Sequence, residues 1–199
     1  MNSQDCSHAA RISLEGLSVG DALGERMFNH HYQIREIVDE VNAPSGPFWY
    51  TDDTEMATVI VEQLETAGCI DQDELALRFG QRFARRPDRG YGSGARLILS
   101  AINAGEPWEA LSKAAFGGKG SMGNGAAMRV APLGAFFADD FHKVVQEAER
   151  SAMVTHYHPE GVAGAVGGAR AAAAVTKIQQ QGVDSCHTSI RVALSSLMP

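Results

Sequence analysis

Three neighbouring side chains with oxygen atoms, those of Thr51, Asp52 and Asp53, stand at the predicted start of a helix. Magnesium takes oxygen ligands and keeps several waters, so a hydroxyl and two carboxylates can form part of a cation site. A structural alternative uses the same stretch, because Asp52 followed by Glu55 fits a capping box that satisfies free amides at a helix start. These residues by themselves leave both interpretations open.

A second candidate ligand site is the glycine-rich segment 117–125, which runs into residues 126–129. Its glycines disfavour a helix, because each costs about 1 kcal/mol relative to alanine. Free amides at the start of the following helix attract anions, which predicts a phosphate or diphosphate site. The segment is not a Walker loop, since Gly120 follows Lys119 and no strand is predicted before it. A plain interhelical loop is the alternative.

Two further clusters carry polar groups next to predicted helices. Thr155 and His156 precede a helix, where a neutral imidazole could bind a ribose or a phosphate or could cap the helix. His156 and His158 do not have the spacing of a zinc site. Asp21, within the glycine-containing stretch 16–24, is either a buried structural acid or an acid near the cation, because buried acids are rare unless they are paired.

Composition limits the class of protein. The chain has 199 residues, 44% hydrophobic and 21% charged, which predicts one globular domain over residues 1–199. Its net charge of -7 argues against a nucleic-acid partner, because phosphate neutralisation dominates such binding. No apolar run reaches the roughly 20 residues of a membrane span, and no leader opens the chain. Cys6, Cys69 and Cys186 lie far apart, so we expect neither zinc nor disulfides and a cytoplasmic location.

The elements expected to position these groups are all helices. Apolar residues recur at helical spacing, and no long segment alternates with the period of a strand. The spacing and the caps predict helices over about 9–23, 51–67, 71–86, 93–104, 107–116, 126–138, 141–154 and 159–181. Pro132 should kink or divide the sixth of these. The arginines at 82, 85, 86 and 89 fit a solvated helix end, where cations are favoured, and contact with an anionic substrate is the alternative.

Four motifs in this order resemble the ADP-ribosylglycohydrolase family, the relatives of the dinitrogenase reductase-activating glycohydrolase. They are Gly20-Asp21-Ala22-Leu23-Gly24, Thr51-Asp52-Asp53-Thr54, Gly123-Asn124-Gly125-Ala126-Ala127-Met128-Arg129 and Thr155-His156. The resemblance spans about residues 16–174. It implies an all-α fold consisting of a single compact multi-helix domain.

The resemblance also implies an activity and the residues that would carry it. Members of this family hydrolyse the glycosidic bond between ADP-ribose and a protein side chain or a small molecule, with two magnesium or manganese ions. Thr51, Asp52 and Asp53 would be metal ligands, and Asp53 would take part in catalysis. The substrate would be bound by Ser121, Gly123, Asn124, Gly125 and His156.

Two departures from the family pattern bear on this activity. The family places a carboxylate four residues after the last glycine of the first motif, where this chain has Phe28. Glu25 is therefore the candidate general acid or base, with a surface glutamate as the alternative reading and Asp88 as a weaker candidate. An Asp-x-Asp-Thr segment that completes the family's metal site is not found before Pro199, so the fold is expected to be shortened at its C-terminal side.

This second departure keeps other functions open. A non-catalytic member that binds ADP-ribose or serves a structural role is the alternative to a hydrolase. A metal-dependent phosphohydrolase is a third candidate and would release phosphate. The motifs do not indicate an oligomeric state.

Overall fold

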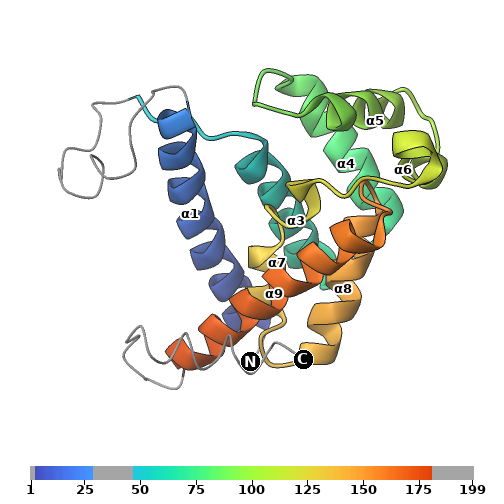
Figure 1. Ribbon diagram of the computed structural model, residues 1–199. Helices are drawn as coiled ribbons and strands as arrows, with labels where there is room; N and C mark the ends of the chain where they lie inside the picture. The colour runs from blue at the N-terminus through green and yellow to red at the C-terminus, as the bar shows by residue number, and fades with distance from the viewer. Residues whose placement is uncertain (1–2, 29–46, 181–199) are drawn as a thin grey trace.

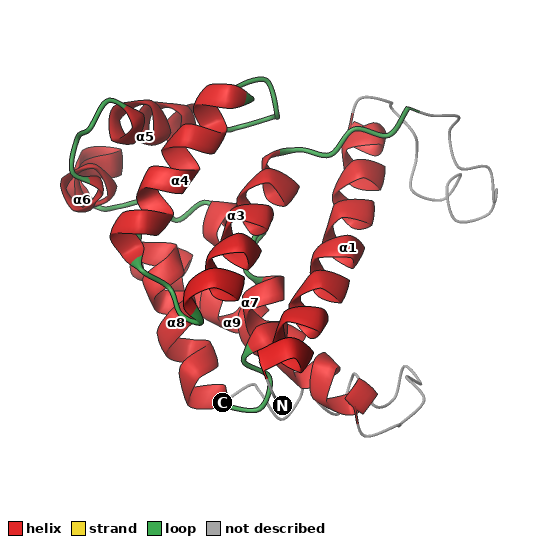
Figure 2. Ribbon diagram, turned by 180° about the vertical axis from the view of Figure 1, so that it is seen from behind, coloured by secondary structure: helices red, strands yellow, loops and turns green. Residues whose placement is uncertain are grey.

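The computed structural model describes residues 3–28 and 47–180, and in these ranges the helices are joined by loops and there is no strand (Figures 1 and 2). The all-α prediction is therefore confirmed. His30, His31, Cys186 and Asp184 lie outside the described residues. None of the described helices is both long and apolar enough to cross a membrane. The elements are α1 (Ser3–Phe28), α3 (Asp52–Ala67), α4 (Gln72–Arg85), α5 (Ser93–Asn103), α6 (Trp108–Gly118), the 3-10 turn η1 (Asn124–Ala126), α7 (Ala131–Phe136), α8 (Phe141–Met153) and α9 (Pro159–Gln180).

The core lies between α3 and the helices around it. Met56, Val59, Ile60 and Leu64 form the buried face of α3, as their helical spacing predicts. Helix α1 packs against α3 and α7, while α4 packs against α3 and α5. Figure 1 shows α1 on one side of the molecule and α5 with α6 on the other, so that α3 and α7 lie between them.

Local signals fix several helix ends as predicted. Asp71 accepts a hydrogen bond from the Glu74 amide at 3.1 Å and begins α4. Gly68, with φ 70°, ends α3 and donates its amide to the Leu64 carbonyl at 2.9 Å. This left-handed conformation costs glycine little, which explains why the helix stops there.

Three predicted boundaries are wrong. The first helix is longer at both ends than the predicted 9–23, because tertiary packing extends it beyond its clearest apolar pattern. Gly92 is the N-cap of α5, so Ser93 is its first residue and makes no capping hydrogen bond. The sixth predicted helix is split: η1 ends at Ala126 and α7 begins only at Ala131, so the chain divides just before Pro132, whose missing amide suits the first turn of a helix.

Helices α7 and α9 cross at very close range. A Cβ atom added at Gly134 would lie 2.1 Å from the Ala169 carbonyl oxygen, so only glycine fits there. Ala165, Ala169 and Ala173 of α9 are fully buried. The small residues of α9 thus let two backbones approach.

Candidate functional site

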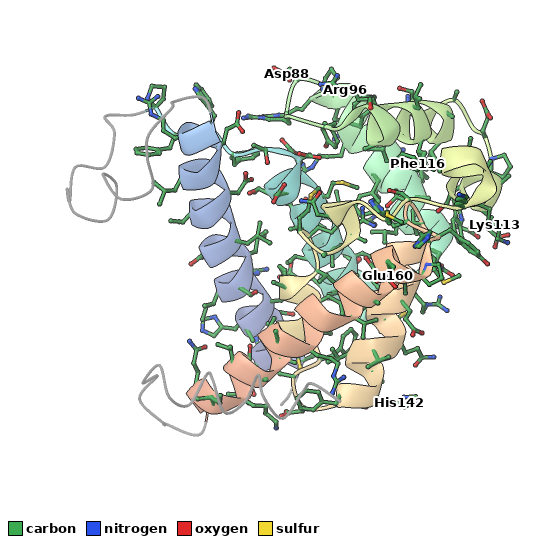
Figure 3. All side chains as sticks on the ribbon, in the orientation of Figure 1. Asp88, Arg96, Lys113, Phe116, His142 and Glu160 are labelled. Carbon is green, nitrogen blue, oxygen red and sulfur yellow. The ribbon has the colours of Figure 1, made fainter. Side chains whose placement is uncertain are left out.

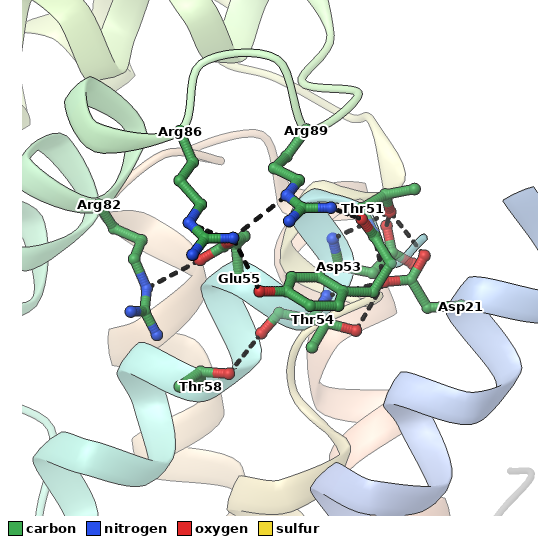
Figure 4. A network of polar contacts seen from close by, with 10 residues as sticks. Asp21, Thr51, Asp53, Thr54, Glu55, Thr58, Arg82, Arg86 and Arg89 are labelled. Carbon is green, nitrogen blue, oxygen red and sulfur yellow. Dashed lines mark hydrogen bonds and ion pairs between the residues drawn. The ribbon is translucent and has the colours of Figure 1, made fainter. Parts of the chain in front are cut away.

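The acidic start of α3 is held from a different helix by Asp21 of α1 (Figure 4). The Asp21 carboxylate accepts hydrogen bonds from the Thr51 amide at 2.8 Å, the Thr51 hydroxyl at 2.7 Å, the Thr54 amide at 3.2 Å and the Thr54 hydroxyl at 2.6 Å. Both of its oxygens are engaged in capping α3. Asp21 is therefore a hydrogen-bonded acid that is half-buried and close to Asp53, and its role near a cation stays a prediction.

The capping-box reading of Asp52 and Glu55 is wrong. Thr51 is the N-cap of α3, and its hydroxyl accepts a hydrogen bond from the Asp53 amide at 3.4 Å. Asp52 is the first helical residue. Glu55 turns away from the cap to Arg82, whose Nε lies 2.9 Å from its carboxylate. The cap therefore leaves the Asp52 side chain free for another role.

The oxygens at this helix start suit a hard cation. The Thr51 hydroxyl gives its proton to Asp21 and accepts one amide, so a second lone pair remains for a ligand. Burial, followed by the neighbouring Asp53, raises the pKa of Asp52 to about 6. Burial and Asp21 also raise the pKa of Asp53. Two half-buried carboxylates that repel each other would gain from a bound cation, which would offset their desolvation.

A cavity of about 270 Å³ places Asp52 opposite the glycine-rich segment. The cavity brings together residues from α3, the start of α5, the end of α6 and the two loops before η1 and α9. The predicted substrate-binding residues all line it. The lining residues used below are Asp52, Gly94, Phe116, Ser121, Gly123, Asn124, Gly125, Arg129 and His156.

His156 forms the buried wall of the cavity beneath the glycine-rich segment. Its Nδ1 lies 2.8 Å from the Thr155 hydroxyl, and burial with nearby Arg129 lowers the pKa of His156 to about 3. The imidazole is therefore neutral. A Cβ atom at Gly125 would lie 2.7 Å from the ring, so the loop can contact the histidine only because residue 125 is glycine.

Arg129 lines the cavity, although the sequence motif assigned it no role. Its side chain is fully buried, donates to the Ser151 carbonyl at 2.8 Å and lies with its guanidinium 4.5 Å from the centroid of the Phe79 ring. Burial lowers the pKa of Arg129 to about 9, while Asp52 opposes that shift. An arginine inside an apolar helical pattern was the available signal, because buried cations are rare without a partner.

Phe116 and the residues that begin α5 were also missed by the motifs. Phe116, which is labelled in Figure 3, has φ 54°, which is unusual for a side-chain-bearing residue. Its ring lies 3.6 Å from a Cβ placed on Gly94. It is 67% exposed although it lines the cavity. The ring therefore forms part of the cavity rim.

The two candidate acids or bases are not among the residues that line this cavity in the described ranges. Glu25 is half-buried on α1, one helical turn beyond Asp21. Asp88 is exposed in the connection from α4 to α5, at the upper edge of Figure 3. The role of either residue stays a prediction.

A larger cavity of about 910 Å³ lies between α1 and α9. Its walls include Ile12, Ala171, Ala172 and Val175, and it contains none of the acids at the start of α3. The smaller cavity combines a carboxylate, a guanidinium and a loop rich in glycine. We therefore place the candidate site in the smaller cavity.

Asp52 faces the glycine-rich segment across one cavity of an all-helical domain, whereas Thr51 and Asp53 are not among the residues that line it. This arrangement agrees with the family that the four motifs resemble. The family model described as ADP-ribosylglycohydrolase matches residues 2–198, so this chain belongs to the ADP-ribosylglycohydrolase family. The resemblance inferred from the four motifs is thereby confirmed.

Similar proteins come from several vertebrates. ADP-ribosylhydrolase ARH3 of Homo sapiens is 37% identical over 179 residues, which cover 78% of this chain and 47% of the human protein. The protein of the same name from Mus musculus is 35% identical over 131 residues, covering 63% and 34% of the two chains. That of Bos taurus is 32% identical over 179 residues, covering 78% and 46%. The chain thus spans about half the length of these curated relatives, or less.

Proposed function

We propose that this chain hydrolyses the glycosidic bond between ADP-ribose and an acceptor side chain or small molecule. The observation that carries the proposal is the cavity itself, which sets Asp52 against Ser121, Asn124 and His156 although about 70 to 100 residues separate them. Membership of the ADP-ribosylglycohydrolase family supports the same chemistry. The name ADP-ribosylhydrolase, carried by the vertebrate relatives, agrees with it.

The size of the cavity limits which part of the substrate it can take. Its volume of about 270 Å³ is slightly below the range of about 300–1,000 Å³ that is usual for pockets of whole ligands. It suits the ribose and part of the diphosphate. The amides of the glycine-rich segment and the buried charge of Arg129 favour the anionic part of the ligand.

Thr51, Asp52 and Asp53 would hold magnesium or manganese, with a pair of ions proposed for the complete site. Such ions orient the hydroxyls of the sugar and activate a water when they are bound. Hydrolysis breaks the bond from the anomeric carbon to the acceptor and forms a bond to water oxygen, while the acceptor leaves with a proton. Asp52 presents negative charge to the positive anomeric centre of the transition state, and neutral His156 offers a ring nitrogen to a hydroxyl or phosphate oxygen.

Release of free ADP-ribose from an ADP-ribosylated protein, measured with magnesium present, tests this function. Asp52→Ala and Asp53→Ala should each reduce the rate more than about 100-fold, because each removes a charged ligand instead of a supporting contact. Glu106→Ala is the matched control, since this exposed acid in the connection from α5 to α6 lies outside the cavity and has no proposed role. Parental rates in both α3 variants would refute the proposed metal role.

Binding of ADP-ribose without turnover is the second candidate function. It is favoured by one observation: residues 3–28 and 47–180 contain no group of three or more histidine, cysteine, aspartate or glutamate side chains placed to hold a metal ion. Calorimetry at saturating magnesium distinguishes the two candidates. Heat from binding of ADP-ribose, together with no product from a modified protein, would select the binding function.

A further inference from the structure

A buried ion-pair cluster lies directly behind the acidic start of α3. Glu55 is only 2% exposed, and three arginines surround its carboxylate (Figure 4). Its oxygens lie 2.9 Å from Arg82 Nε, 3.8 Å from Arg86 Nε and 3.7 Å from Arg89 Nε. The predicted solvated helix end is thus only partly right: Arg82 and Arg89 turn to a carboxylate 27 or more residues earlier, whereas Arg86 is half exposed. Arg85 is exposed and takes no part in the cluster.

Arg89 differs from the other two arginines in what its guanidinium reaches. Its Nη1 donates to the main-chain carbonyl of Tyr50 at 3.1 Å, and its guanidinium carbon lies 4.3 Å from the centroid of the Tyr50 ring. Arg86 contacts only the hydroxyl end of that tyrosine, at 3.5 Å. Arg89 is also the least exposed of the three side chains, at 14%. It therefore links buried Glu55 to the backbone that enters α3.

This link ends at the proposed cation ligands. Tyr50 immediately precedes Thr51, the N-cap of α3. Gly90, next to Arg89, packs against the same residues, since a Cβ placed there would lie 3.4 Å from Thr51 Cβ and 3.5 Å from an Asp52 carboxylate oxygen. The connection from α4 to α5 thus touches the helix start at two adjacent points.

We propose that Arg89, held in place by Glu55, is a positioning residue that fixes Thr51 and Asp52 for cation binding. This inference rests on the proposed function, because it concerns the same oxygens. A guanidinium near the acids repels a cation, so any gain in cation affinity from Arg89 must come from the geometry that it imposes and not from its charge. The planar fork of arginine can reach a carboxylate and a carbonyl together while it stacks on tyrosine.

The charge of Arg89 should weaken cation binding, whereas its positioning of Thr51 and Asp52 should strengthen it, and this difference in sign makes the proposal testable. Binding of Mn²⁺ to the purified chain is followed by electron paramagnetic resonance of the free ion. Arg89→Met retains apolar packing but removes the fork. It should weaken Mn²⁺ affinity about tenfold, the lower end of the usual cost of losing a supporting contact. Arg86→Met removes the same charge from the same glutamate and should leave affinity unchanged or slightly higher.

Arg89→Lys keeps the charge and isolates the geometry. It should also weaken Mn²⁺ binding, by less than Arg89→Met does. Equal Mn²⁺ affinities in Arg89→Met and Arg86→Met would overturn the positioning role. Thermal unfolding of each variant identifies any that fails to fold. If Arg89→Met does not fold, the Mn²⁺ affinity of Arg89→Lys is compared with that of Arg86→Met instead.

Amide hydrogen exchange separates this inference from the proposed function. The Thr51 and Thr54 amides donate to Asp21, and both should exchange faster in Arg89→Met than in Arg86→Met. If the parent chain binds no Mn²⁺, the proposed metal binding is wrong, and amide hydrogen exchange at Thr51 and Thr54 is then the only test of the positioning role of Arg89. Unchanged exchange in Arg89→Met would then reject it.

Discussion

The two walls of the candidate cavity are built on different physical principles. The wall at α3 depends on charged groups. The Asp21 carboxylate of α1 accepts hydrogen bonds at the start of α3, and Glu55 forms ion pairs with three arginines. The wall at the glycine-rich segment depends on close packing, because Gly125 lies against the ring of buried His156. A wall held by ion pairs can tolerate small shifts, whereas a packed wall has no room for one added methyl group.

The largest effect should come from Gly125→Ala, which tests the packed wall. The new Cβ would lie 2.7 Å from His156 Cε1, and the ring is fixed by Thr155, so loop and histidine must separate. We expect about a 100-fold loss of ADP-ribose affinity, the scale of a 1 Å misplacement in a site. Calorimetry measures the change. Gly167→Ala, on α9 with open space around it, should bind as the parent does, and parental affinity in both variants would refute close packing as the basis of this wall.

Glu55→Gln tests the charged wall and should have a smaller effect. Removing one partner of a buried ion pair costs roughly 3–5 kcal/mol, but solvent reaches all three arginines, so we expect a loss of about 2 kcal/mol. Urea unfolding measures this free energy. Arg11→Ala, which breaks the exposed pair with Glu65, is the control and should leave the midpoint unchanged. Equal midpoints for the two variants would mean that the buried cluster contributes no more than a surface pair.

The smallest effect concerns pH and the neutral state of His156. Its pKa is about 3 in the folded chain against an ordinary 6.5, so the unfolded chain binds more protons between these values. Stability from this group is complete above pH 6.5 and is lost as the pH falls toward 3. Asp52, with a pKa raised to about 6, contributes the opposite slope between its ordinary pKa and that value.

The difference between the parent and His156→Gln isolates the histidine. Between pH 6.5 and 5.5 the parent should lose about 1 kcal/mol of unfolding free energy relative to the variant. Denaturant unfolding at the two pH values measures it, and Asp52 cancels because both proteins contain it. Parallel pH profiles would show that the ring is not held neutral.

Local chemistry explains which parts of the fold could be predicted from the sequence. The Asp71 cap and the Gly68 stop depend on residues within a few positions, and the predicted ranges 51–67 and 71–86 end and begin at these signals. The buried face of α3 followed from the helical spacing of its apolar residues. The candidate ligands of the cavity were found through motifs, and their roles stay predictions.

Long-range contacts explain what the sequence could not give. Glu55 looked like a capping residue because its partners, Arg82 and Arg89, come from another helix and its following loop. Arg129 was part of a motif without a role, since only folding shows that it shares a cavity with Asp52. Pairings of this kind depend on tertiary packing, which overrides local preference.

The cap that Asp21 supplies from α1 also has a consequence for protein engineering. The helix start at Thr51 lacks a complete set of partners unless a segment about thirty positions earlier is present and docked. Chimeras that exchange α3 between family members must therefore exchange α1 with it. The new chain ends of a circular permutant should not be placed between α1 and α3, because these two helices behave as one transferable unit.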